Sequence, residues 1–167
     1  MYKRQVGDRI TRVGNLSEAT APQVIDATGL IVAPGFIDPH THALRGIFDV
    51  PNAESALLQG VTTLTEGNDG SSPYPIDRHY ADIQDLRISP NWAVFVGQGT
   101  IRQRVIGFGL RKASPQEMDR MKQMVRDAME QGALGISTGL FYVPGSFTST
   151  EEVIELSKVA ADYNGIY

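Results

Sequence analysis

Short apolar runs alternate with amphipathic stretches along most of the chain. Four of these short apolar runs have the pattern of buried parallel strands, and they cover residues 35–40, 61–66, 93–97 and 133–137. Amphipathic stretches with helical spacing follow them at residues 53–57, 77–88, 115–131 and 150–163. This alternation predicts parallel βαβ units, with a fifth strand beginning at residues 166–167. Periodicity alone does not distinguish an open sheet from a closed barrel.

Capping residues fix the starts of several of these helices. Ser114 supplies an N-cap, Pro115 the first helical position and Glu117 the capping-box partner of the clearest helix. Ser149 is expected to begin the last helix in the same way, and Asn52 to cap the first.

The first third of the chain has a different pattern. Residues 6–13 alternate around a Gly-Asp pair, and residues 23–26 follow after a polar loop, which predicts short antiparallel strands. We therefore expect a partial β subdomain at residues 6–33 and βα units at residues 34–167. Residues 1–5 back-translate to a sequence resembling a transposon-end adaptor, and we set them aside as an artefact.

Composition narrows the possible partners and compartments. With 41% hydrophobic and 20% charged residues the chain has the balance of a soluble domain, and its net charge of −4 without a basic run argues against nucleic acid. No apolar stretch approaches the roughly 18 residues of a membrane span. We expect a small-molecule partner and, by default, a cytoplasmic location. Secretion is left open, because the chain is expected to lack its native N-terminus. The oligomeric state is left open.

Two histidines stand where the first barrel-type strand ends. In an extended segment His40 and His42 point to the same side, with Cα atoms about 6.5 to 7 Å apart. The next strand ends in Glu66 and Asp69, and the ends of parallel strands are where α/β active sites lie. Since the chain has no Cys, a metal here uses N and O ligands. The sequence therefore predicts a divalent-ion site among these four side chains.

Several motifs, in this order, resemble the amidohydrolase superfamily and, within it, the N-acyl-D-amino-acid deacylase branch. They lie at residues 7–10, 25–29, 34–42, 59–63, 67–70, 96–102 and 132–145. The resemblance implies an α/β fold, an incomplete (β/α)8 TIM-type barrel of four to five strands preceded by a small β subdomain. It also implies a metal-dependent hydrolase acting on the amide of N-acyl-D-amino acids or related dipeptides.

The resemblance also assigns residues. It places His40 and His42 at the metal, and it places Asp69 where this branch commonly has a bridging Cys. Asp69 is therefore the expected third ligand, with Glu66 as the alternative. Oxygen in place of sulfur makes the site harder, so we expect one or two divalent ions, Zn2+ first, with Mn, Fe or Co possible. The other metal ligands and the general base are expected beyond Tyr167, so the chain by itself is expected to be inactive. The bridging Lys of hydantoinase-like relatives is absent from residues 133–140.

Candidate substrate-binding residues follow the third and fourth strands. The resemblance places Tyr142 where the family has a Tyr near the substrate carboxylate, and Gln98 is a weaker candidate for the pocket. Arg102 is a weaker pocket candidate in the same way, and for both Gln98 and Arg102 a surface or structural role is favoured over a place in the pocket. We expect His79 to face solvent.

Alternative functions are a non-catalytic barrel that binds a ligand, or another amidohydrolase that opens cyclic amides or cleaves dipeptides. A serine hydrolase is excluded, because the Gly-x-Ser-x-Gly match at residues 135–139 continues into a loop instead of a helix.

Overall fold

The computed structural model describes residues 2–167. The chain divides into two compact units, with the boundary between Pro34 and Gly35. The first unit contains an antiparallel hairpin of β1 (Tyr2–Val6) and β2 (Arg9–Gly14). Its turn is formed at Gly7, whose φ of 60° is accessible to glycine at little cost. The hairpin confirms the antiparallel strands expected around residues 6–13, and it includes residues 2–5, which we had set aside.

The prediction of a strand at residues 23–26 is wrong. No strand is assigned between residues 15 and 34, and Val24 and Ile25 are about four-fifths exposed. The Asp26 carboxylate accepts a hydrogen bond from the backbone N–H of Thr28 at 2.9 Å, which bends the chain into an Asx turn. Apolar alternation was therefore not enough to make a strand where no partner strand is available.

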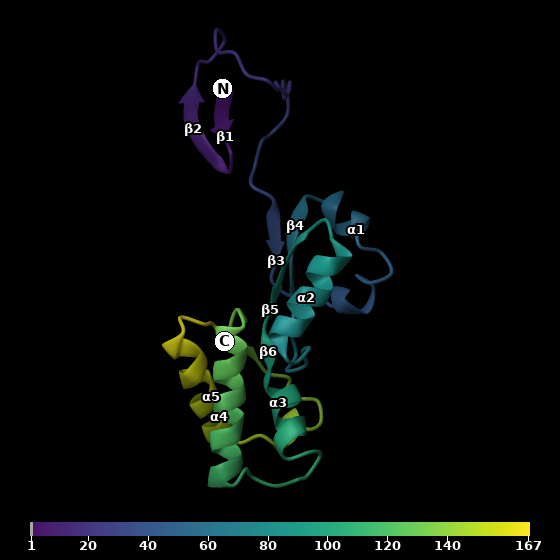
Figure 1. Cartoon of the computed structure of the whole chain (residues 1–167), viewed down its shortest axis with the longest axis vertical. Coiled ribbons are helices and arrows are strands. Elements are labelled where there is room, and N and C mark those ends of the chain that lie inside the picture. The colour runs from purple at the N-terminus through teal and green to yellow at the C-terminus, as the bar shows by residue number, and fades with distance from the viewer. Residues whose placement is uncertain (1) are drawn as a thin grey trace. The chain divides into compact units, whose positions relative to one another are not determined.

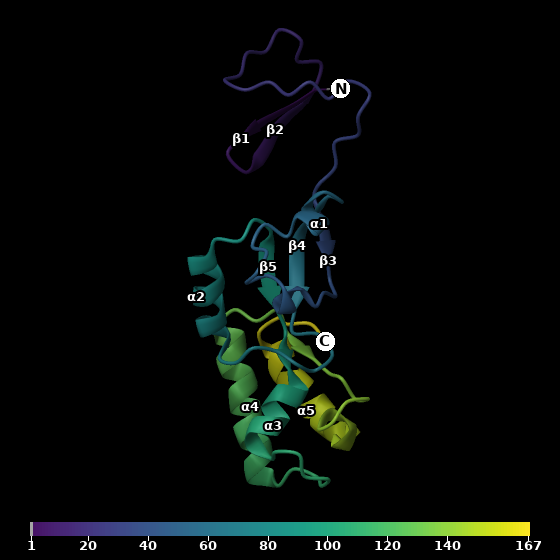
Figure 2. The same ribbon diagram turned by 90° about the vertical axis from the view of Figure 1, so that its right-hand side faces the viewer.

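The second unit contains a parallel sheet and its connecting helices (Figure 1). Strands β3 (Phe36–Asp38), β4 (Val61–Glu66) and β5 (Asn91–Val94) lie side by side in that order (Figure 2), and β6 (Val96–Gly97) pairs with β7 (Ile136–Ser137). Phe95 alone separates β5 from β6, and a parallel bridge joins Gly135 to Ile166. The predicted α/β class with parallel strands is confirmed.

Five α-helices connect or flank these strands. They are α1 (Glu54–Leu57), α2 (Ile76–Leu86), α3 (Gln98–Val105), α4 (Pro115–Glu130) and α5 (Thr150–Asp162), with the short 3-10 helices η1 (Ala43–Arg45) and η2 (Gly145–Phe147). A buried cluster that includes Val94, Ile101, Met121 and Leu156 packs the sheet against α3, α4 and α5. Among the described residues, no helix is both long and apolar enough to cross a membrane.

The capping predictions are right for the last two helices and wrong for the first. Ser114 and Glu117 form the complete capping box of α4, and the Ser149 hydroxyl accepts from the N–H of Glu152 at the start of α5. Asn52 does not cap α1; its side-chain oxygen accepts a hydrogen bond from the Ser89 hydroxyl instead. The helix α3 was not predicted at all.

His79 does not face solvent as expected, since its side chain is buried on α2. Its Nε2 accepts a hydrogen bond of 2.9 Å from the indole N–H of Trp92. Because an indole N–H can only donate, this Nε2 carries no proton and the ring is neutral. Burial lowers the pKa of His79 below its ordinary value of 6.5, and the nearby Asp82 opposes the shift.

This geometry makes stability depend on pH through His79. His79 binds a proton more readily in the unfolded chain than in the folded one. Its contribution to the free energy of unfolding is therefore fully present above pH 6.5 and is lost as the pH falls below that value. We expect the urea midpoint of the full-length gene product to drop between pH 7.5 and pH 5 by more than that of a His79→Gln variant. Parallel curves for the two proteins would contradict this assignment.

Candidate metal centre

Hydrogen bonds between the ends of β3 and β4 hold the segment that carries both histidines. The N–H of His40 donates to the Asp38 carboxylate at 3.1 Å, and the N–H of Thr41 donates to the carbonyl of Thr65 at 3.1 Å. The Thr65 hydroxyl donates back to the carbonyl of Asp38 at 2.8 Å. His40 and His42 thus follow β3 in an irregular segment, whereas the sequence placed them on the strand itself.

The two imidazoles and Asp69 converge on one point. Each Nε2 of His40 and His42 lies 3.4 Å from Oδ2 of Asp69, and the three donor atoms lie within 4.8 Å of one another. Ligand atoms about 2.0 to 2.2 Å from one tetrahedral ion are about 3.3 to 3.6 Å apart, so the two 3.4 Å separations between histidine and Asp69 fit a shared cation. The histidine side chains are about half exposed, at 56% and 55%, which leaves the point accessible.

A tight turn brings Asp69 to the histidines. Asp69 has a left-handed φ of 56°, and Gly67 and Gly70 on either side also have positive φ values. The Ser137 hydroxyl donates to the carbonyl of Gly67 and accepts from the N–H of Gly70 at 3.1 Å, which closes the turn from β7. A Cβ atom on Gly139 would lie 1.9 Å from the carbonyl oxygen of Asp69. Ser137 therefore supports the turn, in agreement with the exclusion of a serine nucleophile.

Glu66, the alternative ligand, lies outside the three-residue cluster. It is buried, and its Oε1 accepts hydrogen bonds from the Thr41 hydroxyl at 2.8 Å and from the N–H of Leu44 at 3.0 Å. The Asn68 amide donates to the carbonyl of Thr41 at 3.3 Å. Glu66 and Asn68 thus anchor the backbone on both sides of His42, which is the usual task of groups behind metal ligands.

Two of the three residues of the cluster, His42 and Asp69, line a cavity of about 500 Å³, a size typical of small-molecule pockets. Its lining includes His42, Asp69, Arg45 and Tyr142. Tyr142 comes from the loop between β7 and α5 and is half exposed, with its N–H donating to the carbonyl of Gly139 at 3.0 Å. The structure therefore places the predicted substrate residue Tyr142 on the same cavity as the metal cluster.

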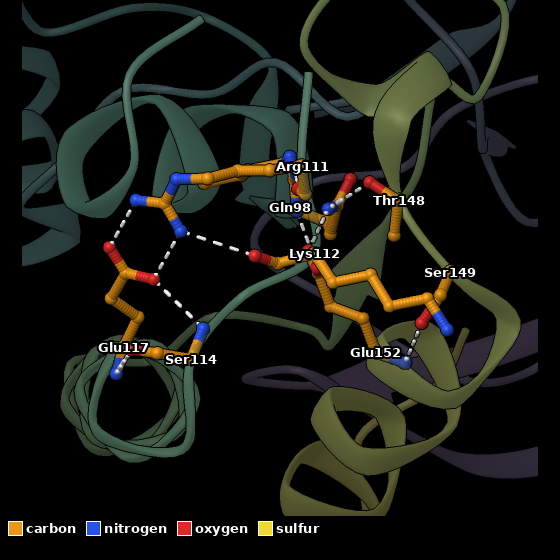
Figure 3. Close-up of polar contacts among 9 residues, drawn as sticks. Gln98, Arg111, Lys112, Ser114, Glu117, Thr148, Ser149 and Glu152 are labelled. Carbon is orange, nitrogen blue, oxygen red and sulfur yellow. Dashed lines mark hydrogen bonds and ion pairs between the residues drawn. The ribbon is translucent and has the colours of Figure 1, made fainter. Parts of the chain in front are cut away.

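Gln98 is not part of that lining and is fully buried (Figure 3). Its amide donates to the Thr148 hydroxyl at 2.7 Å and to the Glu152 carboxylate at 2.8 Å. The other oxygen of Glu152 pairs with the buried Arg102 guanidinium at 2.5 Å, and Arg102 also donates to the carbonyl of Arg111 at 2.5 Å. Arg102 has the structural role that was expected, and Gln98 joins it behind the loop that carries Tyr142.

The start of α4 lies next to this network. Arg111 makes a two-pronged ion pair with Glu117, at 2.7 Å and 2.6 Å, while Glu117 also accepts from the N–H of Ser114 (Figure 3). Chiefly because of the hydrogen bonds from Arg111, the pKa of Glu117 falls to about 2. The sequence analysis missed Glu152 for two reasons. Its partners Gln98 and Arg102 lie 54 and 50 residues away, and a glutamate at the start of a helix is common.

Comparisons with known proteins agree with these observations. Residues 23–163 match the model of the "Amidohydrolase family". A D-aminoacylase of Alcaligenes xylosoxydans xylosoxydans is 39% identical over 184 residues, covering 96% of this chain and 38% of that protein. The chain therefore spans less than two-fifths of the length of this relative.

Two solved structures are similar to the fold. A D-aminoacylase with a binuclear metal centre matches with a TM-score of 0.82 and 35% identity, covering 96% of this chain and 39% of that one. An N-acyl-D-glutamate deacylase of Bordetella bronchiseptica, complexed with zinc and a phosphonate inhibitor, matches with a TM-score of 0.86 and 31% identity, covering 95% and 38%.

Proposed function

The chain belongs to the amidohydrolase family, as its motifs predicted, and from this membership we propose that it contributes the front of a metal-dependent enzyme that hydrolyses the amide of N-acyl-D-amino acids. The convergence of His40, His42 and Asp69, two of which line a cavity, carries the proposal. The names of the relatives, D-aminoacylase and N-acyl-D-glutamate deacylase, support the substrate class.

We propose that the parallel strands form the first part of a (β/α)8 barrel wall. Two backbone hydrogen bonds support this continuity: the N–H of Leu134 donates to Val94 and the N–H of Val96 donates to Gly135. They join the β3-β4-β5 sheet to β7, and Ile166 continues beyond it. The site then lies at the carboxyl ends of the strands, where barrel enzymes have their active sites.

His40, His42 and Asp69 would hold the metal, one or two divalent ions with Zn2+ first and Mn, Fe or Co as alternatives. When bound, such an ion polarises a carbonyl and makes water a stronger acid. The chain's own residues position the ligands: Thr65 and Asp38 fix His40, and Ser137 fixes the turn of Asp69. Tyr142 is proposed to contact the substrate from the cavity wall, with Gln98 orienting its loop from behind.

The full-length gene product should release free amine from N-acetyl-D-amino acids faster than from their L enantiomers. Removal of metal with a chelator should abolish turnover, and added Zn2+ should restore it. Ring opening of a cyclic amide without deacylation would favour another amidohydrolase reaction. Ligand binding without turnover of any amide by the metal-loaded protein would instead indicate a binding protein and contradict the proposal.

A further inference from the structure

We propose that Thr100 is a positioning residue for the candidate metal centre, an inference that rests on the proposed function. Thr100 lies in the first turn of α3 and holds the segment that follows Asp69. It acts through Asp69, which supplies the only carboxylate of the three-residue cluster. The motif at residues 96–102 thereby gains a task at the metal centre.

Four hydrogen bonds join residues 70–72 to the start of α3. The N–H of Thr100 donates to the carbonyl of Gly70 at 3.0 Å, and the N–H of Ser72 donates to the Thr100 hydroxyl at 3.0 Å. The Thr100 hydroxyl donates back to the carbonyl of Ser72 at 3.2 Å, and the Ser72 hydroxyl accepts from the N–H of Gly97 at 2.9 Å. Three of the four bonds use Thr100, and two of these depend on its hydroxyl.

Two glycines of α3 and its N-cap let the segments approach closely. A Cβ atom on Gly99 would lie 2.8 Å from the carbonyl oxygen of Gly70, and one on Gly97 would lie closer still. The carbonyl oxygen of Gly70 is therefore packed directly against the backbone at the start of α3. A side chain at Gly99 would push this carbonyl, and with it the turn of Asp69, away from the helix.

The bonds from α3 complete the support of the Asp69 turn. The Ser137 hydroxyl holds the N–H of Gly70 from β7, and Thr100 holds the carbonyl of the same residue from α3. Both peptide groups of Gly70 are thus fixed, so Asp69 keeps its φ of 56° and its Oδ2 stays 3.4 Å from each imidazole. A ligand that is already ordered loses less conformational entropy when a metal binds, so this support should raise metal affinity.

The helix α3 is itself fixed from its other side. Gln98 is fully buried and donates to the Glu152 carboxylate of α5 at 2.8 Å and to the Thr148 hydroxyl at 2.7 Å (Figure 3). The first turn of α3 therefore makes one contact with the Asp69 turn through Thr100 and a separate contact with Thr148. Each hydroxyl can be removed without removing the other.

The test measures the Zn2+ affinity of the full-length gene product by competition with a chromophoric chelator. We expect Thr100→Val to raise the Kd for Zn2+ about 10- to 100-fold, as is typical when a group behind a metal ligand is lost. Thr100→Ser keeps the hydroxyl and should recover the affinity. Amide hydrolysis by Thr100→Val should be low at limiting Zn2+ and should return at saturating Zn2+, which a general loss of structure would not allow.

Gly99→Ala is a second variant that leaves the hydroxyl in place. Alanine favours a helix, and the added Cβ would contact only Gly70, so this variant should also raise the Kd for Zn2+. Thr148→Val is the matched control, because it removes the hydroxyl of the other contact of α3, and its Kd should equal that of the wild type.

Two results would overturn the role of Thr100 and leave the proposed function standing. One is unchanged Zn2+ affinity in both Thr100→Val and Gly99→Ala. The other is an equal loss of affinity in Thr148→Val. A wild type that binds neither Zn2+ nor another divalent ion would overturn both the role of Thr100 and the proposed function.

Discussion

The His40→Ala/His42→Ala double variant of the full-length gene product is expected to lose bound metal and amide hydrolysis together. Both Nε2 atoms lie 3.4 Å from Asp69, so the double variant keeps one of the three converging donors. A metal contributes several kcal/mol to transition-state stabilisation, and 1.4 kcal/mol is tenfold in rate, so kcat/KM should fall by about a thousandfold or more. Elemental analysis of metal per chain and amine release measure the two losses.

The third histidine of the chain provides the control. His79 is buried against Trp92 on α2 and is not in the three-residue cluster, so His79→Gln should keep its metal and its activity. Half-exposed imidazoles contribute little to packing, so the double variant should remain folded. Its circular dichroism spectrum should therefore match that of the wild type. Normal metal content and turnover in the double variant would show that the cluster is not the metal centre.

Local signals explain which parts of the fold were predictable. The starts of α4 and α5 depend on residues three positions apart, Ser114 with Glu117 and Ser149 with Glu152, so the sequence displays them directly. The helix α3 lacks such a signal, because it starts after Gly97 without a side-chain cap and buries Gln98 and Arg102. Ile101 is the apolar residue on this buried face, and a helix whose buried face is mostly polar shows little apolar periodicity.

The candidate site was predictable in composition but not in detail. Parallel strands bring their carboxyl ends to one edge, which is enough to predict that Asp69 and the histidines are neighbours. The resemblance already favoured Asp69 over Glu66, and the structure supplies the physical reason: the left-handed turn at Asp69 and the hydrogen bonds that occupy Glu66. Both depend on contacts between residues far apart in sequence, and residue patterns do not specify these.

Removing one partner of the buried pair of Arg102 and Glu152 should strongly destabilise this part of the protein. Their side chains are 0% and 2% exposed, and Glu152 also accepts from Gln98. Glu152→Ala would leave the guanidinium buried without a carboxylate, and breaking a buried pair in this way costs about 3 to 5 kcal/mol in the free energy of unfolding. Denaturant unfolding of the full-length gene product measures this loss.

Two further variants separate the buried charge from simple truncation. Glu155→Ala removes a carboxylate from the same helix. Hydrogen bonds from Lys122 and Lys158 lower the pKa of Glu155 to about 2. Because these ion pairs lie at the surface, the denaturant midpoint should change little. Adding Arg102→Met to Glu152→Ala should restore part of the lost stability, because both charges are then gone. The double variant could instead be less stable than Glu152→Ala alone. That result would show that the lost stability comes from packing around Gln98 and Thr148 and not from the unpaired guanidinium.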